Sequence, residues 1–301
     1  MPPYTVVIGL ETHVQLATQS KMFCGCDARY ADAPPNSHVC PVCMGMPGVM
    51  PAINAAAIEY TIMTGLALHC TIPNVSRFDR KNYPYPDLVK GYQISQYDMP
   101  LAVNGWLEFD SDGETRRVGI RRVHLEEDTA KLTHAVDDQG YRVSLVDVNR
   151  SGVPLMEIVG EPDLRSPEEA ELYLRQLRLL LVYLGVTTGN LEEGAFRCDA
   201  NVSLRSDAIT GEKVEIKNLN SFRAVNRALA FEVRRQGALL DAGRAVPQET
   251  RGWSEERQVT VSQRSKEYAH DYRYFPEPDL PPLTLTGSRV GAIRARVPEL
   301  P

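Results

Sequence analysis

Strict alternation of apolar and polar residues constrains the fold of this chain more than any other feature. Between residues 4 and 16 the even positions are mainly apolar, whereas Glu11 and His13 lie on the opposite side. Residues 197–205 and 213–217 alternate in the same way, and a short glycine-containing turn between them indicates a hairpin. These segments predict an antiparallel sheet with one apolar face and one polar face.

Helix signals occur between the alternating segments. A helix is predicted from Ser166, where Glu169 completes a capping box, to a stop at Gly185. A second helix is predicted over residues 221–237, and Asn54 is predicted to cap a third.

Further strands are predicted at residues 116–127, 141–148 and 153–159. Residues 79–105 are rich in Pro, Tyr, Asp and Asn and are predicted to form long loops. The predicted fold class is therefore α+β. The sequence contains no GxGxxG motif and no GxxxxGK[ST] phosphate loop, so a nucleotide that binds here uses neither a Rossmann nor a P-loop site.

Composition is that of an ordinary globular protein, with 301 residues, 43% of them hydrophobic, and a net charge of −6. This mild acidity argues against a free-standing, non-specific nucleic-acid binder. No apolar run is long enough to span a bilayer and no signal peptide is evident, so the expected compartment is the cytoplasm, where thiols stay reduced. Cys70 and Cys198 lie on apolar faces and are predicted to be core residues.

The other four cysteines form two close pairs. They are Cys24-x-Cys26 and Cys40-x-x-Cys43, and the glycines and prolines around them suit the tight turns that bring paired thiolates to a zinc ion. Four thiolates close the coordination shell, so the predicted zinc is structural. The alternative is that these are unrelated thiols in a loop.

Acidic residues gather on the predicted polar face. Besides Glu11 and His13, three acids at residues 126–128 end one strand, and Glu157 interrupts an apolar run that should be buried. Buried carboxylates are costly unless they are paired or bound to metal, and such a set suits Mg²⁺. The alternative is ordinary ion pairing with the nearby arginines Arg121, Arg122 and Arg150. The predicted hairpin adds a metal ligand and a phosphate partner from among Asp199, Glu215 and Lys217.

Several local sequences, taken together, resemble the B-subunit family of the aspartyl/glutamyl-tRNA amidotransferases. In chain order they are VIGLETHVQL (7–16), FDRKNY (78–83), YQISQ (92–96), HLEED (124–128), NRSGVPLMEIV (149–159), RCDANVS (197–203), KNLNSF (217–222) and DYRYFPEPD (271–279). The resemblance runs in one order from about residue 5 to the end of the chain.

The resemblance implies a cradle-shaped α+β catalytic domain similar to glutamine synthetase and the guanidino kinases. It implies an ATP-dependent ligase that phosphorylates the side-chain carboxylate of Glu-tRNA(Gln) or Asp-tRNA(Asn). Ammonia, which a separate amidase (the A subunit) releases from glutamine, then displaces phosphate and gives Gln-tRNA(Gln) or Asn-tRNA(Asn). A small C subunit completes the expected heterotrimer.

The resemblance also assigns site residues. The catalytic residues and Mg²⁺ ligands that it implies are Glu11, His13, Glu127 and Glu157, with Glu215 as a further metal ligand. Residues expected to contact ATP phosphates are Lys81, Arg150 and Lys217. The paired cysteines match a zinc-bearing branch of the family, so the zinc is not expected to be catalytic.

The resemblance predicts a catalytic cradle over residues 1–290, with the zinc loop 24–43 inserted. Residues 291–301 are predicted to start a helical domain, with the rest of that domain and a tail domain absent. Three alternatives remain: a ligase of the glutamine synthetase type that uses free glutamate, a non-enzymatic zinc-ribbon module, and the related archaeal E subunit. The archaeal protein carries an inserted synthetase-like domain, for which the motifs of this chain leave no room.

Overall fold

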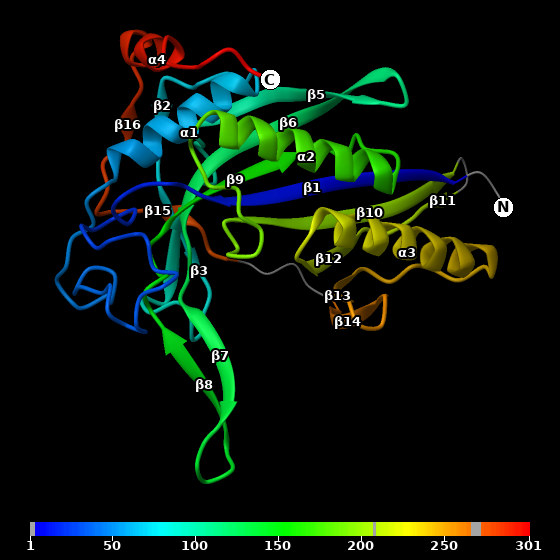
Figure 1. The fold of residues 1–301 in the computed structure, drawn as a ribbon, viewed down its shortest axis with the longest axis horizontal. Helices are drawn as coiled ribbons and strands as arrows, with labels where there is room; N and C mark the ends of the chain where they lie inside the picture. Colours follow the sequence, from blue (N-terminus) through cyan, green and yellow to red (C-terminus); the bar gives the residue numbers. More distant parts are fainter. Residues whose placement is uncertain (1–3, 207–208, 266–271) are drawn as a thin grey trace.

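A nine-stranded sheet forms the centre of the computed structural model, which describes residues 4–206, 209–265 and 272–301. Asp271, the first residue of the 271–279 motif, lies outside these residues. Along the sheet the strands are β14 (Val259–Ser265), β13 (Glu249–Ser254), β12 (Val214–Leu219), β10 (Phe196–Ser206), β1 (Thr5–Gln15), β9 (Pro154–Gly160), β6 (Glu114–Glu127) and β5 (Ala102–Ser111), and β11 (Ile209–Thr210) pairs with β10 (Figure 1). Neighbouring strands are antiparallel except β12 and β13, so the predicted α+β class with an antiparallel sheet is confirmed.

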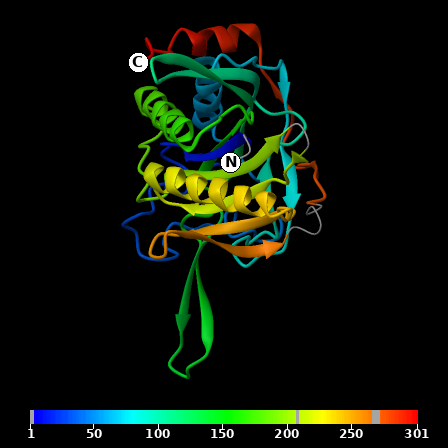
Figure 2. The same ribbon diagram turned by 90° about the vertical axis from the view of Figure 1, so that its right-hand side faces the viewer.

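Two long helices, α2 (Pro167–Tyr183) and α3 (Phe222–Asp241), cover one face of this sheet (Figures 1 and 2). The side chain of Ser166 caps α2 as predicted, and Gly185, with φ +69°, follows its end. The capping box is different from the prediction, because the Glu169 carboxylate accepts the N–H of Arg165 rather than that of the cap residue.

The end predicted for α3 at Gly237 is wrong, since the helix continues to Asp241. A glycine inside a helix costs about 1 kcal/mol relative to alanine. Burial of one side of α3 against β10 and β12 outweighs this cost, and both Leu229 and Gln236 are fully buried there.

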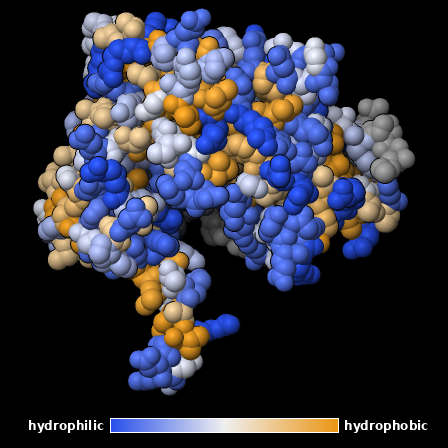
Figure 3. Space-filling model, viewed as in Figure 1, coloured by the Kyte–Doolittle hydropathy of each residue, from blue (hydrophilic) through white to orange (hydrophobic). Residues whose placement is uncertain are grey.

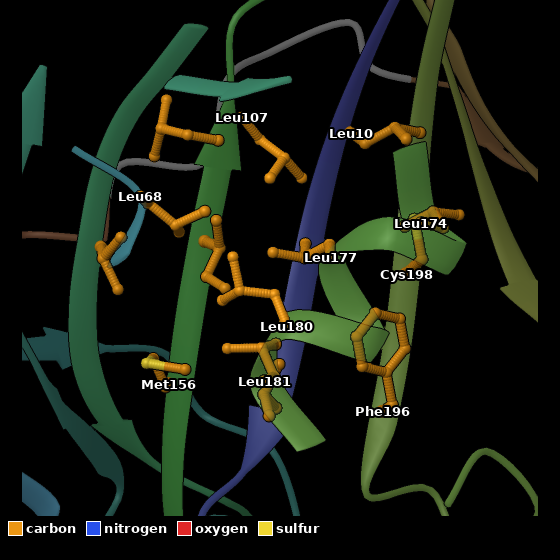
Figure 4. Close-up of a cluster of buried hydrophobic side chains, with 14 of the residues drawn as sticks. Leu10, Leu68, Leu107, Met156, Leu174, Leu177, Leu180, Leu181, Phe196 and Cys198 are labelled. Carbon is orange, nitrogen blue, oxygen red and sulfur yellow. The ribbon is translucent and has the colours of Figure 1, made fainter. Parts of the chain in front are cut away.

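The hydrophobic core lies between the sheet and α2. Leu174, Leu177 and Leu181 of α2 point at the sheet, where they meet Leu10 of β1 and Cys198 of β10 (Figure 4). The predicted burial of Cys198 and Cys70 is confirmed. With one face filled by helices, the polar face of the same strands is left for chemistry.

Helix α1 (Ala55–Ala67) packs beside β5 and β6, and Asn54 caps it as predicted by accepting the N–H groups of Ala56 and Ala57. Helix α4 (Gly287–Arg294) lies against α1. The predicted domain boundary at residue 290 falls inside α4, and the assignment of residues 291–301 to a further domain stays a prediction. Among the described residues, none of the helices is both long and apolar enough to cross a membrane.

The loops predicted for residues 79–105 are partly wrong. This segment holds β3 (Asp79–Asn82) and β4 (Tyr92–Ser95), which form a small sheet with β15 (Phe275–Pro276), and it also includes the start of β5. A second small sheet pairs β2 (Val75–Ser76) with β16 (Leu283–Thr284). These strands are short and carry little alternation, so their pairing depends on contacts with residues about 200 positions later in the chain.

A two-stranded arm, formed by β7 (Lys131–Val136) and β8 (Arg142–Asp147), projects away from the body of the molecule (Figures 1 and 2). The strand predicted at residues 141–148 corresponds to β8. Apolar side chains on the arm are open to solvent, as its orange patches show (Figure 3). Val136 and Tyr141 are each 65% exposed.

Candidate functional site

One row of side chains crosses three central strands on the polar face of the sheet. His13 of β1 is in register with Glu157 of β9, and Glu157 is in register with His124 of β6. Residues in register on neighbouring strands point to the same face. The Glu157 Oε2 atom lies 3.3 Å from His124 Nε2 and 3.6 Å from His13 Nε2.

Glu126, two residues beyond His124, completes a cluster of potential metal ligands. Its Oε1 atom lies 3.8 Å from His13 Nε2. Ligand atoms of His13, Glu126 and Glu157 all lie within 4.8 Å of one another, close enough to share one cation. Two carboxylates and an imidazole therefore converge on one point above β1, β6 and β9.

Two carboxylates on this face have pKa values that are shifted in opposite directions. Burial alone would raise the pKa of Glu157, but the charge and hydrogen bond of His124, and then the charges of His13 and Lys81, hold it below its usual range. The pKa of Glu11 is instead raised by burial and by repulsion from Glu157. Crowded acids of this kind create a demand for positive charge, which a divalent cation would meet.

Glu127 does not belong to this cluster in the structure. Strict alternation along β6 puts His124 and Glu126 on the polar face and sends Glu127 the other way. Its Oε1 atom accepts bonds from Lys90 Nζ at 2.5 Å and from the Ile94 N–H at 3.0 Å. His124 was not predicted, and the resemblance pointed to Glu127 among the three acids at residues 126–128, although the two-residue period within HLEED contained the signal for His124 and Glu126.

Glu215 and Lys217 of the predicted hairpin lie on the same sheet face but apart from the cluster. Lys217 Nζ is 2.6 Å from Asp199 Oδ2 and 3.1 Å from Glu215 Oε1. Asn201 donates a hydrogen bond to Glu11 Oε1 at 3.1 Å. Charges on this side of the face are thus largely paired with one another.

A cleft of about 340 Å³ lies on this side of the polar face. Glu11, Arg121, Asn201 and Lys213 contribute to its walls. Polar and apolar residues both line it, and Glu11 lies two residues before His13 of the cluster on β1.

Lys81 and Arg150, the other predicted phosphate contacts, differ in their surroundings. Lys81 Nζ lies 4.9 Å from the ring centre of Tyr272, and despite its burial the negative charges of Glu126 and Glu157 help to raise its pKa. Arg150 donates instead to the backbone carbonyls of residues 129 and 130, at 2.8 and 3.0 Å. The structure therefore places Lys81 beside the cluster, whereas Arg150 fastens a turn.

Part of the polar face carries ordinary ion pairs between arginines and carboxylates, which was the alternative to a metal site. Arg121 Nη2 lies 2.8 Å from Glu161, and Arg197 Nη2 lies 3.0 Å from Asp128, a residue that Arg150 also approaches. The carboxylates of the cluster itself have imidazole neighbours rather than guanidinium partners.

The four paired cysteines come together in the loop between β1 and α1. The sulfur atoms of Cys24, Cys26, Cys40 and Cys43 all lie within 4.8 Å of one another. Four thiolates around Zn²⁺, with bonds of about 2.3 Å, would lie about 3.8 Å apart, and the Cys40 and Cys43 sulfurs are 3.9 Å apart. The pKa of Cys43 is lowered to about 4, chiefly by a hydrogen bond from Cys24. This geometry fits a tetrahedral metal.

Comparisons with known proteins identify the family of the chain. The family model described as the GatB/GatE catalytic domain matches residues 6–290. The chain is 65% identical to the B subunit of the aspartyl/glutamyl-tRNA(Asn/Gln) amidotransferase from Thermomicrobium roseum, and the match covers 99% of this chain and 62% of that protein. The protein of the same name from Dehalococcoides mccartyi is 61% identical (100% and 62% covered), and that from Carboxydothermus hydrogenoformans is 54% identical (100% and 63% covered). The chain thus spans about three fifths of the length of these curated relatives.

Proposed function

Because the chain belongs to the GatB/GatE catalytic-domain family, we propose that it is the ATP-dependent catalytic part of an aspartyl/glutamyl-tRNA amidotransferase. The reaction would be a C–N bond ligation with glutamine as the amide donor, acting on Glu-tRNA(Gln), Asp-tRNA(Asn) or both. The observation that carries the proposal is the convergence of His13, Glu126 and Glu157 on the polar face of the sheet. This face bears potential ligands for a cation. The Ser95 hydroxyl touches the cluster, but it is buried and donates a hydrogen bond to Glu126 Oε2 at 3.3 Å.

The chemistry proposed suits such a face. A carboxylate is a poor electrophile, because it is anionic and oxide is a poor leaving group. Transfer of the γ-phosphoryl group of ATP to a carboxylate oxygen releases ADP and turns that oxygen into a good leaving group. Ammonia then attacks the acyl carbon, and phosphate departs. Phosphoryl transfer depends mainly on positioning and on stabilisation of negative charge.

Magnesium is the cation that we propose for this face. Its proposed ligands are drawn from Glu11, His13, Glu126, Glu157 and Glu215. Mg²⁺ neutralises phosphate charge when it is bound. Glu126 replaces Glu127 in the predicted set of ligands, because of these two adjacent residues Glu126 is the one on the face of His13. A role for Glu127 in catalysis remains a prediction.

Lys81 and Lys217 are proposed to contact the phosphates of ATP. Lys81 is adjacent to the cluster, and Lys217 lies on the neighbouring part of the same face. Arg150 was predicted for the same role, but its bonds to the turn at residues 129–130 favour a structural one.

The paired cysteines are proposed to hold a structural Zn²⁺. Their four sulfurs would complete a tetrahedral shell and leave no position for a reacting water. The remaining proposals follow from the family: a cradle resembling glutamine synthetase, an amidase as the A subunit, a small C subunit, misacylated tRNA as substrate, and a cytoplasmic location.

The test supplies the chain with ATP, Mg²⁺, ammonium chloride and mischarged Glu-tRNA(Gln), in the presence of the A and C subunits, and measures Gln-tRNA. Ammonium bypasses the amidase, so product reports on this chain. Product that is lost in Glu157→Gln and kept in Glu249→Gln, a buried carboxylate outside the face, would support the proposal. Free glutamate in place of the charged tRNA tests for a small-molecule ligase.

A version extended to the full length of the relatives serves as the second arm. Product from the extended protein alone would mean that the shorter chain lacks tRNA capture, and the site assignment would stand. Absence of product from both, with the partner subunits shown to be active, would sink the proposal.

A further inference from the structure

Arg122 is a guanidinium on the polar face with no anionic partner among the described residues. Other cations on this face are neutralised: Arg197 lies 3.0 Å from Asp128, and Lys217 lies 2.6 Å from Asp199. The Nε atom of Arg122 is enclosed and has no hydrogen-bond partner in the described part of the chain. Because a buried N–H without an acceptor is costly, the position indicates an acceptor, such as an anion, that is not part of the protein.

A β-bulge in β6 places the side chain of Arg122 on this face. Pairing between β6 and β9 shifts register between Ile120 and Arg122, which leaves Arg121 as the extra residue. Arg121 forms a bidentate pair with Glu161. Arg122 is then in register with Val159, whose other neighbour is Glu11. The alternation that follows carries His124 and Glu126 onto the same face.

Arg122 lies two residues before His124 on β6, so strand register places it beside the metal-ligand cluster. Burial raises the pKa of Tyr274 to about 12, and the phenol feels the charges of Lys81, Glu126, Glu157 and Arg122 together. Lys81 has no ion pair within 4 Å among the described residues either, and its ammonium group is lodged between Tyr83 and Tyr272. Two cations that bond to no anion in the described ranges therefore lie on the same side of the sheet as the cluster.

We infer that Arg122 binds the phosphoryl group that is transferred from ATP, together with Lys81; this rests on the function proposed above. The planar fork of a guanidinium matches two phosphate oxygens, and it would bind them next to the cation held by His13, Glu126 and Glu157. During transfer a substrate carboxylate oxygen forms a bond to the γ-phosphorus, and the bond from that phosphorus to the β–γ bridging oxygen breaks. ADP leaves with the electron pair, while Arg122 keeps contact with the moving group.

The test compares two arginines of β6. Dissociation constants are measured by calorimetry for the magnesium complexes of ADP and of a β,γ-imido analogue of ATP, which is not hydrolysed. For Arg122→Gln we expect affinity for the ATP analogue to fall tenfold or more, with affinity for ADP changed less than threefold. Arg117→Gln, on the same strand but exposed and paired with Glu108, should leave both constants unchanged. Circular dichroism and thermal unfolding check that each variant is folded.

Each other outcome decides against the inference. Equal losses of ADP and ATP-analogue affinity would place Arg122 at another part of the nucleotide. Unchanged affinities in Arg122→Gln would remove it from the site while leaving the proposed function intact. If the unaltered chain binds neither nucleotide, the proposed ATP-dependent function fails and the inference fails with it. Arg122→Lys, which keeps the charge, replaces the glutamine variant if that variant unfolds.

Discussion

The cysteine cluster and the His13–Glu126–Glu157 cluster can both hold a metal, but the chain builds them in opposite ways. The four thiols lie within twenty residues of each other in one loop, whereas the other three ligands come from three strands and from positions as distant as 13 and 157. Local spacing is enough to specify the first cluster. The second exists only when strand register is correct. One site is therefore a property of a segment, and the other is a property of the whole sheet.

Their expected effects on stability also differ. The loop that holds the cysteines contains little regular secondary structure, so metal–thiolate bonds would be its main constraint. The carboxylate cluster rests on a sheet whose opposite face is filled by α2 and its leucines. We expect removal of the first metal to damage the structure and removal of the second to damage only binding.

The largest effect is expected from Cys43→Ser, which removes one of the four thiolates. Loss of zinc should free the loop at residues 24–51 and lower the free energy of unfolding by more than about 3 kcal/mol. Zinc content by atomic absorption, thermal unfolding and the sites of limited proteolysis measure this. Cys70→Ala is the control, since Cys70 lies in the core; it should retain zinc. A folded, protease-resistant loop in Cys43→Ser would contradict the expectation that only the cysteine cluster is needed for stability.

The next effect is expected in metal binding. Glu157→Gln removes a charged ligand, so affinity for Mn²⁺, used as a paramagnetic substitute for Mg²⁺, should fall about a hundredfold, or ~2.7 kcal/mol. Thermal stability should change much less than in Cys43→Ser. Electron paramagnetic resonance titration gives the affinity. Unaltered Mn²⁺ binding would show that the cluster is an ion-pair network rather than a metal site.

The adjacent residues Glu126 and Glu127 test the same difference between metal binding and stability within one strand. Glu126→Gln should weaken Mn²⁺ binding and leave stability nearly unchanged. Glu127→Gln should leave Mn²⁺ binding unchanged but destabilise the fold by about 2 kcal/mol, because Lys90 loses its buried partner. Denaturant unfolding and Mn²⁺ titration are measured on both variants. The reverse result would restore Glu127 to the metal site.

The smallest effect is expected at a buried ion network outside both clusters. Glu249 bonds to Arg251 at 2.6 Å, and although burial acts to raise its pKa, bonds from Ser262 and Arg251 lower it overall. A lowered pKa stabilises the fold above the unfolded-state value near 4.5, and this stability is lost as the pH falls through the folded-state value. Glu249→Gln should therefore cost on the order of 1 kcal/mol at pH 7, with a difference from wild type that shrinks toward about pH 3. A difference independent of pH would contradict this account, and added metal should not alter it.

Much of the fold was predictable from sequence because its signals are local. Alternation identified β1 and β10, and Ser166 marked the start of α2 by a side chain that bonds three residues ahead. All four cysteines of the loop were predicted from spacing, and the structure brings them together.

What escaped prediction depends on distant partners. β3 has four residues, and it becomes a strand because β4 and β15 pair with it. Glu126 was one of the three acids noted at residues 126–128, but the resemblance pointed to its neighbour Glu127, whereas alternation along the strand decides which of the two faces His13. The face of the sheet on which Arg122 lies could not be predicted from sequence, because the bulge at Arg121 reverses the alternation that precedes it.

The central place of β1 has a consequence for how the molecule is made. His13 pairs with Glu157 on one side and with Arg197 on the other, so the first strand to be synthesised waits for partners about 140 to 180 residues away. At a translation rate of about 5–20 residues per second, the nascent chain would carry this strand with both edges unpaired for roughly 7 to 30 s. An open, half-apolar strand is prone to pair with the wrong chain during that time. Ribosome-associated chaperones would therefore be expected to matter more for the yield of this protein than for that of a sheet whose first strand lies at its edge.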